Sequence, residues 1–404
     1  MKNIIALLLT ALLLEGFLLP ASLGATDFGL ILNQSAEAGG VEEASFLYEA
    51  NFIPRFSFLL GDSGEFIVTA GMTAGYDRDG YVIPELLRTE LSWLFSNAAI
   101  TAGRMQYSAP FDYVAGGLFD GFQFSYDSPA GTFNAGVWYT GLLYKKKANI
   151  TVTAEDSQSY HAVVDYDNFS DTYFASRRIV TAFGWDHPSI AELVRVKLAV
   201  IAQADMNGRD DYLHSQYVTA KIGVPVESFF FELSGALELA ETGDGFNIGL
   251  AGELGAFWTL PTAFPSRLSF TGHFSSGKAT SGPLAAFTPI TAKPCGAVLE
   301  AEPSGISSLS LDYTANLYKT FSAGLTSSYF IRSDLGTYTG YPLDTENNDG
   351  YFLGNEFFTR LVWSPVSDLQ ISLGGGIFLP STGNASPGRE SLWRIKLAAV
   401  LALY

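Results

Sequence analysis

The sequence predicts an all-β protein, a transmembrane antiparallel β-barrel of about 18 strands with short turns at one rim and long loops at the other. Three observations lead to this fold class. The first is composition, since aromatic residues make up 14% of the chain and charged residues only 16%, against roughly 25% charged residues in an average soluble domain. The second is alternation of apolar and polar residues, and the third is a regular difference in connection length.

The N-terminal residues 1–25 are a predicted secretory signal. Lys2 supplies a positive start, residues 4–14 are apolar with one exception, and residues 21–25 have small side chains suited to cleavage. This apolar run is shorter than the ~20 residues of a membrane-spanning helix. We therefore expect an exported chain.

The remaining residues, 26–404, are expected to form a single barrel domain. No apolar run in this range reaches the ~18 residues that would indicate a membrane helix. The only cysteine, Cys295, has no partner for an internal disulfide. We interpret it as an inert loop thiol.

Alternation is the main evidence for the strands. Apolar residues occupy every second position over residues 194–203, 229–239, 246–258 and 321–332, with polar or small residues between them. A barrel strand that crosses a bilayer needs about 9–11 residues, with apolar side chains toward lipid and polar ones toward the lumen. Eighteen such segments are predicted, starting near residues 27, 44, 65, 86, 99, 118, 132, 173, 193, 212, 228, 246, 267, 305, 321, 351, 369 and 392.

The connections between these segments differ in a regular way. Every second one is mostly short and turn-like, as at 61–64 and 128–131, whereas the long ones, such as 145–172 and 276–304, fall among the others. Outer-membrane barrels have short periplasmic turns and longer extracellular loops. Both of these long loops are expected to be able to fold inward and narrow the lumen.

The C-terminal segment 392–404 fits barrel closure. Apolar residues share one parity with Trp393, Arg394 and Lys396 lie on the other, and the chain ends on Tyr404. A last strand must pair with the first, because an unpaired edge cannot be satisfied in lipid. An aromatic terminus is also the signal that the barrel-assembly machinery is expected to read.

Charged residues on the strands are predicted to face the lumen, since one at the lipid midplane costs about 2–4 kcal/mol. Most acidic residues lie in the loops, and the net charge is -18. A basic wall would favour anionic solutes, while the alternative is that the charges only brace and hydrate the lumen. The predicted pore-lining residues are Arg88, Glu90, Arg104, Arg178, Arg195, Lys197, Lys221, Glu356, Arg360, Arg394 and Lys396.

Two strand pairs resemble a known family. The segments AGRMQY at 102–107 and GGLFDGFQFSY at 116–126, with similar blocks at 353–365 and 374–380, resemble the alginate-export-type outer-membrane porins. The resemblance implies an eighteen-stranded barrel that passes anionic polysaccharide or small solutes through an arginine-rich lumen. By this resemblance, the wall positions of most interest are Arg104, Asp120, Glu356 and Arg360.

No catalytic motif supports an enzyme, and no cofactor or metal is predicted. The patterns GxSxG, HExxH and CxxC do not occur in the sequence. His273 near Ser275 is the one candidate for a catalytic pair, and a rim histidine without a role is the simpler interpretation. Residues 344–350 carry oxygen ligands without EF-hand spacing, and the acidic, exported chain does not suggest nucleic acid.

The sequence therefore predicts a porin-like channel of the bacterial outer membrane. We expect it to pass small hydrophilic solutes, with anionic sugar acids or oligosaccharides as the favoured class. Outer-membrane lipids, including lipopolysaccharide-like lipids, are the other expected partners. The alternative is a surface-exposed barrel that binds a partner through its acidic loops.

Overall fold

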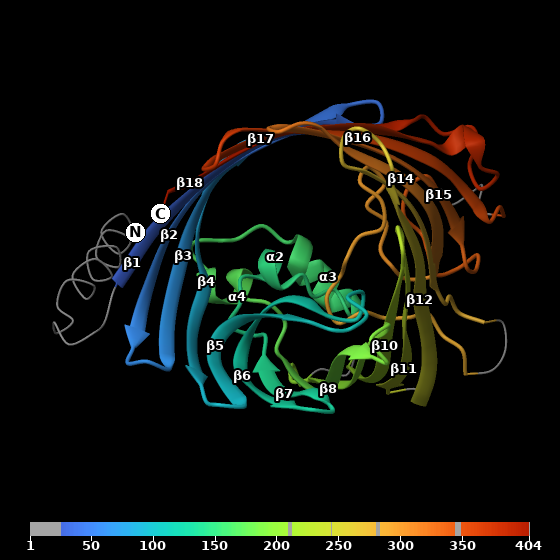
Figure 1. The fold of residues 1–404 in the computed structure, drawn as a ribbon. Coiled ribbons are helices and arrows are strands. Elements are labelled where there is room, and N and C mark those ends of the chain that lie inside the picture. The colour runs from blue at the N-terminus through green and yellow to red at the C-terminus, as the bar shows by residue number, and fades with distance from the viewer. Residues whose placement is uncertain (1–25, 209–211, 244, 280–282, 344–348, 404) are drawn as a thin grey trace.

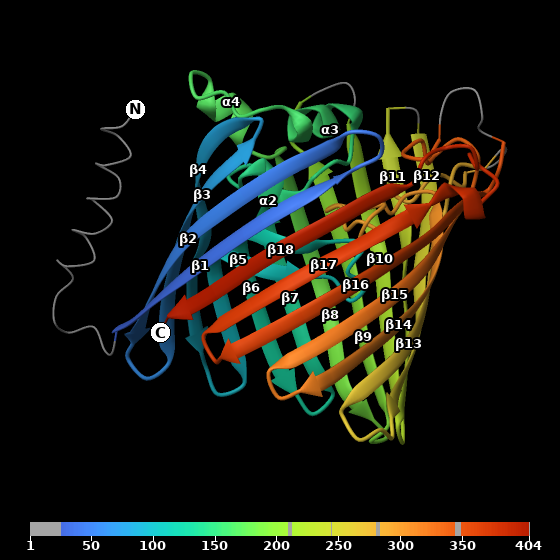
Figure 2. The ribbon, with the colours of Figure 1, turned by 90° about the horizontal axis from the view of Figure 1, so that it is seen from above.

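A computed structural model describes residues 26–208, 212–243, 245–279, 283–343 and 349–403. The predicted signal, the terminal Tyr404 and most of the segment 344–350 lie outside the described residues. The predicted fold class is confirmed, because one antiparallel sheet of 18 strands closes on itself. Figure 1 looks along the barrel, and Figure 2 shows its side.

Every strand pairs with its neighbours in the chain, and β18 pairs with β1. The register of this closing pair runs from Leu30 opposite Leu403 to Gly40 opposite Trp393. The strands are β1 (Thr26–Gly40), β2 (Ala44–Leu60), β3 (Gly64–Asp77), β4 (Asp79–Leu94), β5 (Ala98–Ser108), β6 (Gly116–Ser128), β7 (Gly131–Tyr139), β8 (Arg178–Ile190), β9 (Val194–Asp205), β10 (Leu213–Val226), β11 (Phe229–Thr242), β12 (Gly245–Leu260), β13 (Ser266–Ser275), β14 (Ile306–Tyr318), β15 (Phe321–Arg332), β16 (Phe352–Val366), β17 (Leu369–Leu379) and β18 (Leu392–Leu403).

Sixteen of the predicted strand starts lie within two residues of the observed ones, and the other two differ by more. β4 begins seven residues before the predicted position 86, and β8 begins five residues after 173. The helix α4 (Phe169–Tyr173) occupies the predicted start of β8. Pro84 argued against a strand over the early part of β4, since a proline cannot donate a backbone hydrogen bond. It is tolerated there because β4 pairs with β5 only from Thr89 onward, so Pro84 has no β5 neighbour to which it would donate.

The alternation of side chains is that of a membrane barrel. On β11, Phe231, Leu233 and Leu237 are 43–56% exposed on the outer face, whereas Ser234 and Glu238 on the opposite face are buried. Exposed apolar residues of this kind occur on most of the strands. An apolar band around a closed barrel matches lipid rather than water. Among the described residues, no helix is long and apolar enough to cross a membrane.

The two rims differ as predicted. The turns that follow β2, β4, β6, β8, β10, β14 and β16 are short, and the long connections leave from the other rim, which also carries the helices (Figure 2). The loop between β7 and β8 contains α2 (Lys145–Ala148), α3 (Ala154–His161) and α4, and a 3-10 helix, η1, spans Pro380–Thr382. Figure 1 shows α2 and α3 inside the ring of strands.

Three segments extend from the wall into the barrel. We call these segments the β5–β6 loop (residues 109–115), the β7–β8 loop (140–177) and the β13–β14 loop (276–305). A buried apolar cluster joins the β5–β6 and β13–β14 loops to the wall and includes Phe111, Val114, Phe287, Ile290, Trp138, Val180 and Ile201. The buried apolar residues of the β7–β8 loop, such as Leu143 and Ile150, form separate smaller clusters. The lumen is therefore partly filled by protein, and both loops predicted to be able to narrow it extend inward.

Candidate solute pathway

The three inward loops join at residues 290–292 of the β13–β14 loop. The backbone N–H of Ile290 donates to the carbonyl of Val114 (2.8 Å) in the β5–β6 loop, and that of Ala292 donates to Asn149 (2.9 Å) in the β7–β8 loop. Thr291 Oγ1 accepts from the N–H of Gly116 (2.8 Å), where β6 begins. Hydrogen bonds between the loops thus join them into one constriction.

Arg178 fixes the β7–β8 loop to the wall. It faces inward as predicted, but it is completely buried and pairs with Asp156 (2.5 Å) and Asp205 (3.1 Å). Asp156 also caps the N-terminus of α3, because Asp156 and Thr153 exchange hydrogen bonds in a capping box. Arg178 is therefore an anchor beneath the loop and not an exposed wall residue.

Arg104 departs from the prediction that it lines the pore. Arg104 lies opposite Asp120 in the register of β5 and β6. Ala102, two residues before Arg104, lies opposite Phe122, which is exposed on the outer face, so alternation places Arg104 on the outer face as well. Above Arg104, β4 and β5 separate, and the guanidinium bridges the gap by donating to Asp120 (2.7 and 2.8 Å) and to the carbonyls of Leu86 and Leu142. The predicted inward direction of Arg104 is therefore wrong. Its buried guanidinium links β5 to β4 at the point where these two strands separate.

Glu356 also differs from an open wall residue. Its side chain faces inward as predicted, yet it is 1% exposed because the β13–β14 loop covers it. Its carboxylate accepts hydrogen bonds from the backbone of residues 297–299.

Most of the other predicted residues face the lumen in ion pairs. Arg88 pairs with Glu90 (2.7 Å), Lys197 with Asp186 (3.3 Å), and Lys221 with Glu232 (2.8 Å), while Arg394 and Lys396 share Glu37. Arg195 and Arg360 are exposed and have no carboxylate within ion-pair distance among the described residues. The wall is therefore of mixed charge, and Arg195 and Arg360 are the two predicted cations that lack an ion pair with a described residue.

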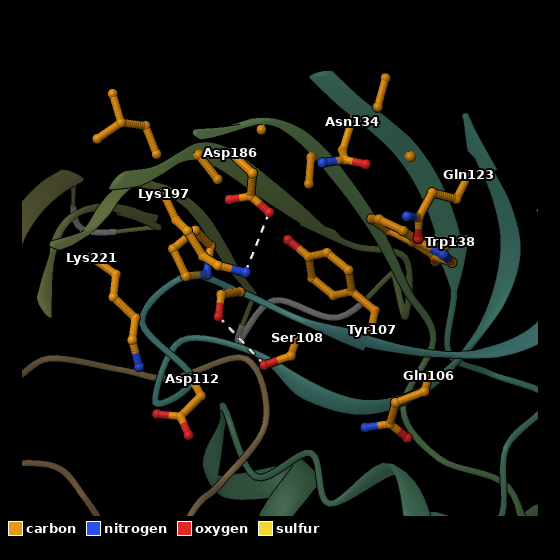
Figure 3. Close-up of a pocket in the computed structure, with 18 residues that line it drawn as sticks. Gln106, Tyr107, Ser108, Asp112, Gln123, Asn134, Trp138, Asp186, Lys197 and Lys221 are labelled. Carbon is orange, nitrogen blue, oxygen red and sulfur yellow. Dashed lines mark hydrogen bonds and ion pairs between the residues drawn. The ribbon is translucent and has the colours of Figure 1, made fainter. Parts of the chain in front are cut away.

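A cavity of about 420 Å³ lies on the short-turn side of the constriction, against β5–β10 (Figure 3). Lys197 and Lys221 lie directly opposite each other in the β9–β10 register, and both line this cavity. In the view of Figure 3 the Tyr107 hydroxyl is turned toward the Lys197–Asp186 pair. The lining also includes the amide side chains of Gln106, Gln123 and Asn134 and the carboxylate of Asp112.

A second cavity of about 570 Å³ lies near the short-turn rim of β12–β16. It is lined by Arg267 and Arg360 together with hydroxyl and amide groups, and none of the described residues that line it is acidic. Its polar and aromatic lining includes Thr314, Asn316, Ser322, Thr326 and Phe358.

Sequence reasoning missed several of these lining residues. The sequence DHPS at 186–189 has the residues of a turn, yet β8 continues to Ile190 and carries Asp186 on its inner face. The polar residues Gln123 and Asn134 lie on predicted strands, and their parity was the signal that could have identified them.

The candidate catalytic pair is not assembled. His273 is buried beside Tyr113, with ring centroids 4.2 Å apart, and its ring nitrogens have no hydrogen-bond partner among the described residues. The hydroxyl of Ser275 bonds instead to the backbone of Ile306.

The fold and this lumen define a class of protein, the membrane-spanning β-barrel with a loop-narrowed lumen. A scan against models of protein families gives no match, and a search of curated proteins also gives none. The chain is similar to solved outer-membrane proteins of Pseudomonas aeruginosa. OccK5 (OpdH) has a TM-score of 0.65 at 11% identity, covering 94% of this chain and 98% of that one.

Two further solved structures have the same fold. OccK2 (OpdF), solved in complex with glucuronate, has a TM-score of 0.61 at 12% identity, over 95% of this chain and 99% of that one. OprD has a TM-score of 0.57 at 14% identity, over 94% and 93%. These likenesses show the fold of a bacterial outer-membrane porin, as predicted. The narrower alginate-export resemblance stays a prediction.

Proposed function

We propose that the protein is a diffusion channel of the outer membrane for small hydrophilic solutes, and that it favours solutes with a carboxylate, such as sugar acids. The observation that carries the proposal is the pair Lys197 and Lys221, which lie directly opposite each other at the cavity below the constriction. Like charges in this position repel each other. A carboxylate bound between them would offset that repulsion.

The cavity offers the other contacts that such a solute needs. The amide groups of Gln123 and Asn134 supply hydrogen-bond donors and acceptors for hydroxyl groups, and Tyr107 supplies an aromatic ring. The glucuronate complex of OccK2 is a precedent among proteins with this fold. Because three loops narrow the lumen, we propose a small solute rather than a polysaccharide, and we propose no catalysis.

Two partner assignments belong to the same proposal. Lipids of the outer membrane, including lipopolysaccharide-like lipids, would contact the apolar outer face. The assembly machinery would bind the C-terminal strand through Tyr404, and deletion of that residue is expected to lower the amount of assembled barrel.

Liposome swelling with the refolded protein tests the solute preference. Glucuronate is expected to enter faster than glucose, and the double variant K197Q/K221Q is expected to lose this difference. K319Q is the matched control, since Lys319 is exposed in the turn after β14, away from the cavity. Equal glucuronate and glucose rates in the unsubstituted protein would refute the preference, and the absence of any swelling would refute the channel.

A further inference from the structure

A segment of the β13–β14 loop crosses the inside of the barrel and is held at both ends by a buried wall carboxylate. We call residues 287–299 the strap. Glu238 on β11 holds its first end and Glu356 on β16 holds its second. Each of these glutamates is 1% exposed, and neither is in an ion pair with any described residue.

At the first end, Glu238 and Tyr217 hold Thr288 from two sides. The Thr288 N–H donates to Glu238 Oε2 (2.7 Å), and the Tyr217 hydroxyl donates to the Thr288 carbonyl (2.6 Å). Gly249 lies opposite Glu238 in the register. A Cβ atom on Gly249 would lie 2.4 Å from Glu238 Oε2 and 3.0 Å from the Cα of Phe287, so glycine leaves room for this contact.

At the second end, one carboxylate accepts three successive backbone N–H groups. Ala297 donates to Glu356 Oε1 (2.7 Å), while Val298 (3.0 Å) and Leu299 (2.8 Å) donate to Oε2. These donors are inside the barrel, and a buried N–H group left without an acceptor is costly. Gly296 turns the chain into this position with φ of 86°, a conformation that favours glycine.

The middle of the strap binds both the β5–β6 loop and the β7–β8 loop. Ile290 and Ala292 hold Val114 and Asn149 through backbone hydrogen bonds, and Lys293 pairs with Asp112 (2.6 Å). A shift of the strap would therefore move all three loops. We propose that Glu238 and Glu356 are positioning residues that set the open cross-section of the channel by fixing the strap at both ends.

The proposal concerns specificity by size and is separate from the carboxylate preference. It rests on the proposed channel function only where conductance is measured. The position of the strap itself can be followed without any solute, because the single cysteine of the chain, Cys295, lies in the strap and is buried.

The test measures the rate at which a hydrophilic maleimide labels Cys295 in the refolded full-length barrel. The variants are E238Q, E356Q and both together. E65Q is the matched control, because Glu65 on β3 has the same inward parity as Ile67 opposite Glu90, lines neither cavity and has no contact with the strap among the described residues. Labelling in E356Q and in the double variant is expected to rise by about tenfold or more, which corresponds to about 1.4 kcal/mol easier opening.

Single-channel recording gives the second measurement. The double variant is expected to show larger or more variable open steps and to admit larger uncharged polymers than the unsubstituted protein. Only protein that shows the heat-dependent gel shift of a folded barrel is compared. Should the glutamine variants fail to fold, G249A is used instead, since its Cβ displaces the same contact from the neighbouring strand.

The outcomes separate this proposal from the proposed function. If labelling and polymer cut-off stay at the level of E65Q in folded variants, the positioning role is wrong while the channel stands. If labelling rises but no protein conducts, the strap is held as proposed and the channel function is wrong.

Discussion

Lys197 on β9 lies directly opposite Lys221 on β10, and each ammonium group is paired with a carboxylate on its far side. The four side chains form a row of acid, base, base and acid, made by Asp186, Lys197, Lys221 and Glu232. Opposed like charges usually destabilise a sheet. An anion in the cavity that both lysines line would offset their repulsion, which is why we propose that this part of the wall selects the solute.

Removal of Arg178 is expected to destabilise the barrel strongly. R178A leaves Asp156 and Asp205 buried without their cation, and breaking a buried ion pair from one side costs about 3–5 kcal/mol. K197A breaks an exposed pair and is expected to cost at most about 1 kcal/mol. Urea unfolding of the two variants in lipid vesicles measures the difference, and similar midpoints would show that the buried arrangement is not an anchor.

Arg360 is expected to bind anions more strongly than Arg88 does. The Arg360 guanidinium lines the second cavity and has no ion-pair partner among the described residues, whereas Arg88 already donates two hydrogen bonds to Glu90. If phosphate reduces the current, R360Q is expected to weaken that block by about tenfold, since a hydrogen bond to a charged group contributes about 1.5–3 kcal/mol. R88Q is expected to change the block much less, and the opposite order would contradict the assignment.

The buried thiol of Cys295 predicts a loss of stability at high pH. Burial raises the pKa of this thiol from its ordinary value of 9.0 to about 12. The folded state therefore keeps a proton that the unfolded chain loses, and the stabilisation is present below pH 9.0 and lost as the pH rises toward 12. The urea midpoint between pH 8 and pH 10.5 is expected to fall less in C295A than in the unsubstituted protein; equal falls would contradict this.

Gly296 is expected to tolerate no side chain. Its φ of 86° disfavours other residues, and a Cβ there would lie 2.8 Å from Glu356 Oε2. G296A is therefore expected to speed maleimide labelling of Cys295 and to lower the urea midpoint. Gly388 is the control, because a Cβ there meets no atom within 4 Å. Indistinguishable behaviour of G296A and G388A would argue against a close fit at this end of the strap.

The sequence by itself determined the barrel, the strand number and the face of most side chains. Period-two alternation and turn residues are local, so strands such as 229–239 could be placed within one or two residues of their observed starts. The inward direction of Lys197, Lys221, Arg360 and Lys396 followed from the same parity, because lipid excludes charge from the other face.

Only the tertiary structure decided which charges remain open to the lumen. Ion pairs such as Lys221 with Glu232 depend on contacts between strands, and the exception at Arg104 arises where β4 and β5 separate. The hydrogen bonds that Glu238 and Glu356 accept from the strap connect residues 50–59 positions apart in the sequence. Such contacts leave no periodic trace in the sequence, because a loop's course is set by the partners it meets after the barrel has closed.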